Sequence, residues 1–216
     1  MKTNGTDFLV HFRKHDLVIA KAIRQVGPFT LKPNRDRFGM LVRSIISQQI
    51  STSAARAILA RVVALMEDGK LHADKIAALS PEQLRQAGVS PQKIGYLLDL
   101  ATKVADGTVL LDRMGRLSDE RVIEELTQVK GIGRWTAQMF LIFSLGRPDV
   151  FPHDDLGVRS AIKRLYGLEE LPDKQTSLAI GSRWSPYATV ASWYCWRTLE
   201  LNSKPTKIPK PNTAAK

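Results

Sequence analysis

The sequence predicts an all-α fold, and three observations support that prediction. Apolar residues recur at helical spacing, as Ile58, Val62 and Leu65 do on one face of segment 51–69. Serine, often followed by proline, stands where such segments begin, and glycine stands where they end. No stretch alternates polar and apolar residues for long enough to predict a sheet. Together these features indicate roughly nine or ten short helices.

The start and stop signals place the helices in order along the chain. A serine hydroxyl caps the first turn, and a proline directly after it loses no helical hydrogen bond. A glycine ends a helix because it adopts the left-handed conformation at little cost. The expected starts are Ser80, Ser90, Ser118 and Ser185, and the expected stops are Gly69, Gly88 and Gly107.

Composition narrows the class of function. The chain has 216 residues and 44% hydrophobic content, enough for a substantial core. Its formal net charge of +11 favours a polyanionic partner, either nucleic acid or an acidic membrane surface. Segment 204–216, predicted to be a basic disordered tail, has four lysines and so supplies only part of that charge.

Membrane and secreted classes fit the sequence poorly. No window approaches 18 uncharged apolar residues, and charge interrupts the N-terminal apolar residues early. The expected helices have no strongly one-sided face of Lys and Arg. The single cysteine, Cys195, cannot form an intramolecular disulfide. We therefore expect an intracellular protein without membrane association.

Segment 118–146 is predicted to be a helical hairpin, with the turn "VKGIGR" between two helices. Gly131 and Gly133 allow a tight turn and leave backbone amides uncovered near the start of the second helix. Such amides bind a phosphate without reading a base, so the hairpin would position nucleic acid regardless of sequence. A plain helix connection that needs two glycines is the alternative.

Four stretches resemble one family. They are "LTQVKGIGRWTAQMF", "VFPHDDLGVR", "VRSIISQQISTSAA" and "WSPYATVASWYCW", and together they cover most of 36–200. They resemble the helix-hairpin-helix DNA glycosylase superfamily, in its 3-methyladenine DNA glycosylase II (alkylation-repair) branch. The chain is too short for the extra N-terminal β domain of some members, so it resembles the compact form.

The resemblance implies a two-lobed helical glycosylase fold with the active-site cleft between the lobes. One lobe would combine 1–34 with 143–203, and the central domain, 35–142, would end in the hairpin. The implied activity is that of a monofunctional DNA glycosylase in base excision repair. It would flip out and excise N-alkylated purines of the 3-methyladenine and 7-methylguanine type from duplex DNA, leaving an abasic site.

The resemblance implies that Asp155, directly before "LGVR", is the catalytic residue. A carboxylate stabilises the positive charge that develops on the sugar as the base leaves. Read from the residues alone, either Asp154 or Asp155 is a good helix N-cap, and capping does not exclude catalysis. We expect Asp154 to orient the loop and His153 to be a solvated loop residue.

The family's lyase members carry a nucleophilic lysine two positions after the second hairpin glycine. Here that position is Trp135, so the resemblance implies no lyase activity. One cysteine cannot supply the four thiolates of an iron-sulfur cluster. We expect no cofactor, apart from a possible structural monovalent cation at the hairpin backbone.

The resemblance also assigns binding residues. The base pocket would contain Trp135, Met139, Trp196 and Gln48. The DNA backbone would be bound at Gly131, Gly133, Arg134 and Thr136. Gln49 and Ile50 are the candidates for the wedge that fills the gap left by a flipped base. Trp193 and Trp184 are expected in the core.

Two other functions remain open on sequence alone. A non-catalytic hairpin module would bind distorted DNA, with Asp155 only a cap. A glycosylase for deaminated or oxidised bases would use the same carboxylate. The partner expected for a repair enzyme is double-stranded DNA containing alkylated bases, bound by a monomer. The expected compartment is the bacterial cytoplasm with its nucleoid, or the nucleus in a eukaryote.

Overall fold

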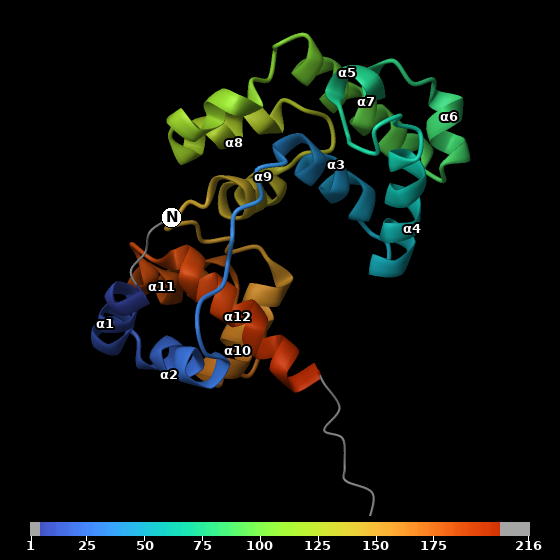
Figure 1. Cartoon of the computed structure of the whole chain (residues 1–216). Helices are drawn as coiled ribbons and strands as arrows, with labels where there is room; N and C mark the ends of the chain where they lie inside the picture. The colour runs from blue at the N-terminus through green and yellow to red at the C-terminus, as the bar shows by residue number, and fades with distance from the viewer. Residues whose placement is uncertain (1–4, 204–216) are drawn as a thin grey trace, which may run out of the picture. The chain divides into compact units, whose positions relative to one another are not determined.

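A computed structural model describes residues 5–203, and the tail expected at 204–216 lies outside them. Within this range every regular element is helical, which confirms the all-α prediction (Figure 1). The α-helices are α1 (Gly5–His15), α2 (Leu17–Val26), α3 (Arg37–Ser47), α4 (Thr52–Val63), α5 (Ala73–Ala77), α6 (Pro81–Gln86), α7 (Pro91–Ala105), α8 (Asp119–Thr127), α9 (Arg134–Phe140), α10 (Leu156–Tyr166), α11 (Lys174–Gly181) and α12 (Ala188–Ser203). Short 3-10 helices η1 (Leu111–Arg116) and η3 (Ser182–Trp184) and a π-helical turn, η2 (Leu141–Leu145), complete them.

The chain divides into two compact units. Unit 1 is Leu31–Pro152, and unit 2 combines residues 5–30 with 153–203. Segments 31–34 and 143–152, expected in the discontinuous lobe, belong to unit 1. The reason is that η2 continues α9 without a break, and the backbone amide of Asn34 donates to the carbonyl of Phe143 at 2.7 Å.

In unit 1 the long helix α7 packs against α3, α5 and α6, while α3 also contacts α4 and α9 (Figure 1). Helix α8 pairs with α9 to form the hairpin. The core between these helices is aliphatic and aromatic, and its fully buried side chains include Leu41, Ile45, Val122, Leu97, Leu100 and Phe140. Burial of this apolar surface is the main force that holds the hairpin in place.

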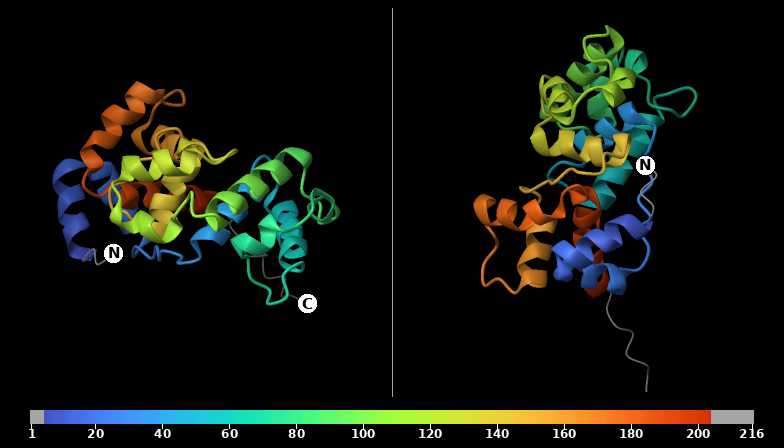
Figure 2. Two further views of the ribbon diagram at one scale, coloured as in Figure 1. Left: turned by 90° about the horizontal axis from the view of Figure 1, so that it is seen from above. Right: turned by 90° about the vertical axis from the view of Figure 1, so that its left-hand side faces the viewer.

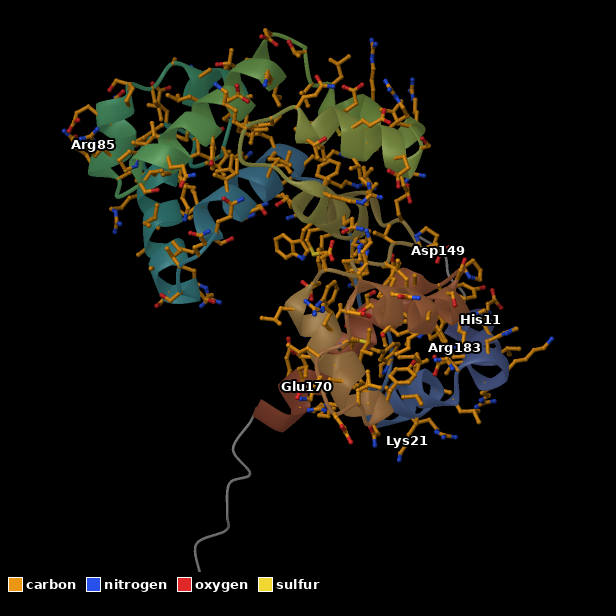
Figure 3. The ribbon with its side chains drawn as sticks, turned by 180° about the vertical axis from the view of Figure 1, so that it is seen from behind. His11, Lys21, Arg85, Asp149, Glu170 and Arg183 are labelled. Atoms are coloured by element: carbon orange, nitrogen blue, oxygen red, sulfur yellow. The ribbon has the colours of Figure 1, made fainter. Side chains whose placement is uncertain are left out.

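In unit 2 helix α12 lies beside α2 and α10, and α1 packs on α2 (Figures 1 and 2). Trp184 is fully buried and Trp193 is 7% exposed, so both belong to the core as expected. Cys195, on the same helix as Trp193, is also fully buried. His11 of α1 donates from Nε2 to the carbonyl oxygen of Arg183 at 3.0 Å, which ties α1 to η3 (Figure 3).

A buried carboxylate organises the interior of unit 2. Asp16 caps α2 by accepting hydrogen bonds from the backbone amides of Val18 and Ile19. Its other oxygen accepts from the hydroxyl of Tyr166 at 2.5 Å and from the indole nitrogen of Trp184 at 3.0 Å. Burial, together with the hydrogen bond to Asp16, raises the pKa of Tyr166, so this phenol stays a donor.

Most of the predicted helix signals are present. Ser80 forms a full capping box with Gln83, and Ser118 accepts a hydrogen bond from the backbone amide of Arg121. Gly69, Gly88 and Gly107 all have a positive φ, as stops require.

Two predicted starts are wrong in detail. Ser90 precedes α7, but its side chain makes no capping hydrogen bond. Helix α12 begins at Ala188 instead of directly after Ser185, because the amide of Tyr187 bonds to the carbonyl of Trp184 in a preceding turn.

No helix within residues 5–203 is both long enough and apolar enough to cross a membrane.

Candidate functional site

The hairpin of unit 1 runs from the cap Ser118 to Gly146, whose left-handed φ of 66° ends the second helix. The two glycines of its turn differ in backbone conformation and in surroundings. Gly131 has φ +80°, and a Cβ there would collide with the ring of Tyr96. Gly133 has an ordinary extended backbone, and a Cβ there would meet nothing within 4 Å. Gly131 is therefore required by packing, whereas Gly133 leaves the surface of the turn uncovered.

The carbonyl oxygens of the turn already accept hydrogen bonds from the protein. That of Gln128 accepts from the amine of Lys103 at 2.7 Å, and that of Gly131 from the side-chain amide of Gln48 at 2.9 Å. The carbonyl of Val129 accepts from the backbone amide of Ile132. A lysine ammonium bonded here also repels a second cation. Each of these carbonyl oxygens keeps a second lone pair, so the structural monovalent cation expected at the hairpin backbone stays a prediction.

Arg134 and Thr136 lie at the start of α9. The guanidinium of Arg134 makes two hydrogen bonds to Glu120 of α8, at 2.7 and 3.1 Å. This paired contact joins the two hairpin helices. Thr136 is only 3% exposed, so little of the residue reaches the surface.

A groove of about 500 Å³ lies next to the hairpin in unit 1, within the size range of small-ligand sites. Trp135 and Met139 of α9 and Ile50 of the loop after α3 all line it. Trp135 is 43% exposed and Ile50 37%, which is unusual for large apolar side chains, whereas Met139 is buried. Arg56 adds positive charge to the lining, whereas the guanidinium of Arg43 is paired with Asp36 at 2.9 Å. The groove thus combines an aromatic face with a cationic side chain.

Loop 47–51 carries the other predicted residues. Gln48 does not line the groove, because its side-chain amide reaches the carbonyl of Gly131 in the hairpin turn. Gln49 has φ 57°, the left-handed conformation that non-glycine residues rarely adopt. Loop 47–51 is thus bonded to the hairpin turn.

Asp155 lies in unit 2, at the start of α10, and is 9% exposed. Its Oδ1 accepts the backbone amide of Val158 at 2.8 Å, so the predicted cap is present. The same oxygen accepts the indole nitrogen of Trp196 at 2.8 Å. Two N–H donors and a helix N-terminus hold the carboxylate in one orientation, where it can stabilise a developing positive charge.

Gly157, the second residue of α10, permits this contact. A Cβ at this position would come within 3.0 Å of Cδ1 of Trp196 and 3.1 Å of Oδ1 of Asp155. With any side chain at position 157, the indole and the carboxylate could keep their contact only if one of them shifted. The glycine in "DDLGV" thus has a packing reason, which the sequence did not reveal to us.

His153 is not the solvated residue that we expected. Its side chain is only 11% exposed, and its Nε2 lies 3.2 Å from the carboxylate of Asp154, which is largely exposed. The orienting role expected of Asp154 stays a prediction.

The structure groups the predicted residues within each unit. In unit 1 it places Trp135 and Met139 on one groove with Ile50 and bonds Gln48 to the hairpin turn. In unit 2 it joins Trp196 to Asp155. The indole–carboxylate bond was missed because residues 41 positions apart carry it, and no local pattern signals such a contact.

The chain matches the family model described as HhH-GPD superfamily base excision DNA repair protein over residues 42–186. It is 35% identical to DNA-3-methyladenine glycosylase 1 of Schizosaccharomyces pombe over 96% of this chain and 94% of that protein. The structure of this yeast enzyme in complex with abasic DNA is similar with a TM-score of 0.81, covering 92% of this chain and 98% of the other.

A DNA-3-methyladenine glycosidase structure from Bacillus halodurans is 37% identical with a TM-score of 0.80, covering 91% of this chain and 89% of the other. A Bacillus subtilis relative is also 35% identical over 76% of this chain, but the match spans 59% of its length.

Proposed function

The chain belongs to the HhH-GPD superfamily of base excision DNA repair proteins, and from this premise we propose that it is a DNA-3-methyladenine glycosylase. It excises N-alkylated purines such as 3-methyladenine and 7-methylguanine from duplex DNA. Its relatives named as 3-methyladenine glycosylases, and the yeast structure with abasic DNA, support this assignment. It acts as a monomer in the compartment that holds the DNA.

The observation that carries the proposal is the fixed carboxylate of Asp155. As the bond from the base to the sugar breaks, positive charge develops on the sugar ring, and a negative charge already in place stabilises it without reorganisation. The cap to Val158 and the bond from Trp196 supply that preorganisation. A methylated purine is cationic and leaves readily, so modest stabilisation is enough. Water completes the hydrolysis.

The remaining residues bind the substrate. Trp135 offers an electron-rich ring to a cationic base, and Met139 adds an adaptable apolar surface next to it. Trp196 can present its ring face to a base while its N–H stays on Asp155. Stacking on an aromatic ring contributes roughly 1–3 kcal/mol per base, comparable to the cost of flipping. The turn around Gly133 contacts the DNA backbone, and Ile50 or Gln49 enters the base stack.

The reaction stops at base release. The position of the family's lyase lysine is Trp135, and an indole cannot form a Schiff base with the sugar. The product is therefore an intact strand with an abasic site. Because that lysine is absent, we expect borohydride to trap no covalent complex between the protein and the DNA.

The test is release of free bases from methylated duplex DNA by the natural protein and by Asp155→Asn. Asparagine keeps the N-cap and removes the charge, so we expect unchanged folding and duplex binding. Base release should fall by at least about 100-fold, the effect of removing a group that stabilises transition-state charge. Chromatography of the released bases gives the lesion range, and circular dichroism with a binding titration provides the controls.

Other outcomes identify the other functions. Equal release by both proteins would remove Asp155 from the catalytic role. Binding to distorted duplex without release of any base would identify a non-catalytic hairpin module. Release of hypoxanthine or 8-oxoguanine, with methylated purines left in the DNA, would move the substrate to deaminated or oxidised bases.

A further inference from the structure

Loop 47–51, which follows α3, is bonded to a lysine of α7. The amine of Lys93 donates to the carbonyl of Ile46 at 2.7 Å and to that of Gln48 at 2.6 Å. The last carbonyls of a helix have no partners within the helix, and a cation there also interacts favourably with the helix dipole. Lys93 therefore caps α3 and fixes the exit of the chain into the loop.

The location of Lys93 is unfavourable for its own helix. It occupies the third position of α7, in a first turn that contains no acid, where a positive charge opposes the dipole. Partial burial also lowers the pKa of its amine. Its contribution must come from the contact with α3, because nothing within α7 rewards a cation there.

The same face of α7 supports the hairpin turn. Tyr96, Asp99 and Lys103 follow Lys93 at helical spacing. The ring of Tyr96 packs against Gly131, and Lys103 donates to the carbonyl of Gln128. Asp99 accepts the backbone amide of Lys130 at 2.9 Å. Although burial raises the pKa of Asp99, hydrogen bonds from Lys103 and Lys130 outweigh it and lower the pKa, so the acceptor stays charged.

Two features show that the loop depends on these polar contacts. The bond from Gln48 to the carbonyl of Gly131 links loop and hairpin directly. A cavity of about 210 Å³, lined by Gln49, Ile50 and Lys93 among others, lies beside the loop. Apolar packing on that side is therefore incomplete, and the loop has room to collapse once Lys93 is removed.

We propose that Lys93 is a positioning residue that holds loop 47–51 at a fixed distance from the hairpin turn, so that the wedge enters the stack while the turn grips the backbone. The proposal rests on the glycosylase function above. Opening a base pair needs both elements at once, whereas a lesion without a pairing partner flips at lower cost. Lys93 should therefore matter most when the damaged base is paired.

The test compares Lys93→Met, which keeps the length and loses the charge, with Lys75→Met as the matched control. Lys75 is an exposed lysine of the same unit, on α5. The probes are duplexes with one 7-methylguanine, either paired with cytosine or opposite an abasic-site analogue. For Lys93→Met we expect about a tenfold or greater loss of kcat/KM on the paired lesion and less than about threefold on the unpaired one.

Lys75→Met should change both substrates by the same small factor, and Lys93→Arg should recover most of the loss because its guanidinium can donate to both carbonyls. An equal loss by Lys93→Met on both lesions, or no loss, would overturn the proposal. Failure of the natural protein to release any base would instead count against the glycosylase function.

Hydrogen exchange tests the positioning without DNA or catalysis. In Lys93→Met the amide of Gln48, which donates to the carbonyl of Ile45, should exchange at least about tenfold faster while those of α12 stay unchanged. Unchanged exchange in the loop would overturn the proposal whatever the activity results are.

Discussion

Two aspartates in unit 2 make the same two kinds of contact. Asp16 and Asp155 each cap a helix and each accept the indole N–H of a tryptophan, Trp184 and Trp196 respectively. Asp16 is enclosed by a further bond from Tyr166 and is 3% exposed, whereas Asp155 is 9% exposed. The first pair therefore serves the core. The second fixes a carboxylate whose charge is available for chemistry.

This pairing predicts different results for two similar substitutions. Trp196→Phe keeps an aromatic face but removes the donor to Asp155, so the carboxylate can rotate. A hydrogen bond to a charged group contributes about 1.5–3 kcal/mol, which corresponds to roughly a 10- to 100-fold lower kcat if it is all expressed in the transition state. KM should change little because the ring remains. Single-turnover rates at saturating enzyme measure this effect.

Trp184→Phe is the control, because it removes the corresponding donor at Asp16. It should lower the free energy of unfolding by about 1–3 kcal/mol and leave the rate of the folded enzyme unchanged. If Trp184→Phe reduced the rate as much as Trp196→Phe, the lower rate of Trp196→Phe would reflect a general loss of core order and not the lost bond to Asp155.

At the scale of elements, α7 contacts both loop 47–51 and the hairpin turn. The roles of the two glycines of that turn can be distinguished by experiment. Gly131→Ala forces a side chain into a left-handed backbone, at a cost of about 1–3 kcal/mol, and against the ring of Tyr96. Gly133→Ala meets open space with an ordinary φ. Denaturant titration should show a loss of at least about 2 kcal/mol for Gly131→Ala and under about 0.5 kcal/mol for Gly133→Ala.

For binding to duplex DNA, Gly133→Ala is the informative variant. Gly133→Ala folds normally, yet its added methyl covers the surface of the turn, so its affinity for undamaged duplex should fall. Equal stability of the two variants would mean that the turn relaxes without Tyr96.

Sequence signals located most helices because caps and periodicity are local. The Ser-Pro starts at Ser80 and Ser90 show both the strength and the limit of such signals. Ser80 is followed at the third helical position by Gln83, which completes a capping box, whereas Ser90 is followed there by Lys93. A lysine has no acceptor to offer the cap, and it bonds to α3 instead. The serine hydroxyl predicted a cap at both places. The reciprocal partner at the third position completes the capping box, but it is not required for the cap itself, because Ser118 accepts the backbone amide of Arg121.

At the scale of the molecule, composition and motif order identified the class of partner and the family, while long-range contacts set the site. The bond from Trp196 to Asp155 and the packing of Tyr96 on Gly131 join residues far apart in sequence. The boundary of unit 1 likewise depends on the π-helical continuation of α9, which apolar periodicity does not distinguish from a helix end. The net charge of +11 favours binding to any duplex, so we expect the residues around Asp155 and the groove to select the lesion.

The single thiol of the chain offers a built-in reporter for the opening of unit 2. Cys195 is fully enclosed by α12 and its neighbours. Burial, aided by the negative charges of Asp16 and Asp155, raises its pKa above the usual 9.0, so the reactive thiolate is suppressed in the folded protein. The thiolate becomes accessible only when α12 separates from the rest of the unit.

Labelling of the native protein with an aromatic disulfide at pH 8 should therefore be slower than that of free cysteine by at least about a thousandfold, as the population of open states dictates. The rate should rise with denaturant and fall when abasic duplex binds, if DNA stabilises the unit that holds Asp155. Fast stoichiometric labelling without denaturant would show that α12 is not closed. The one sulfur atom thus turns the stability of the surroundings of Asp155 into a colour change that can be timed.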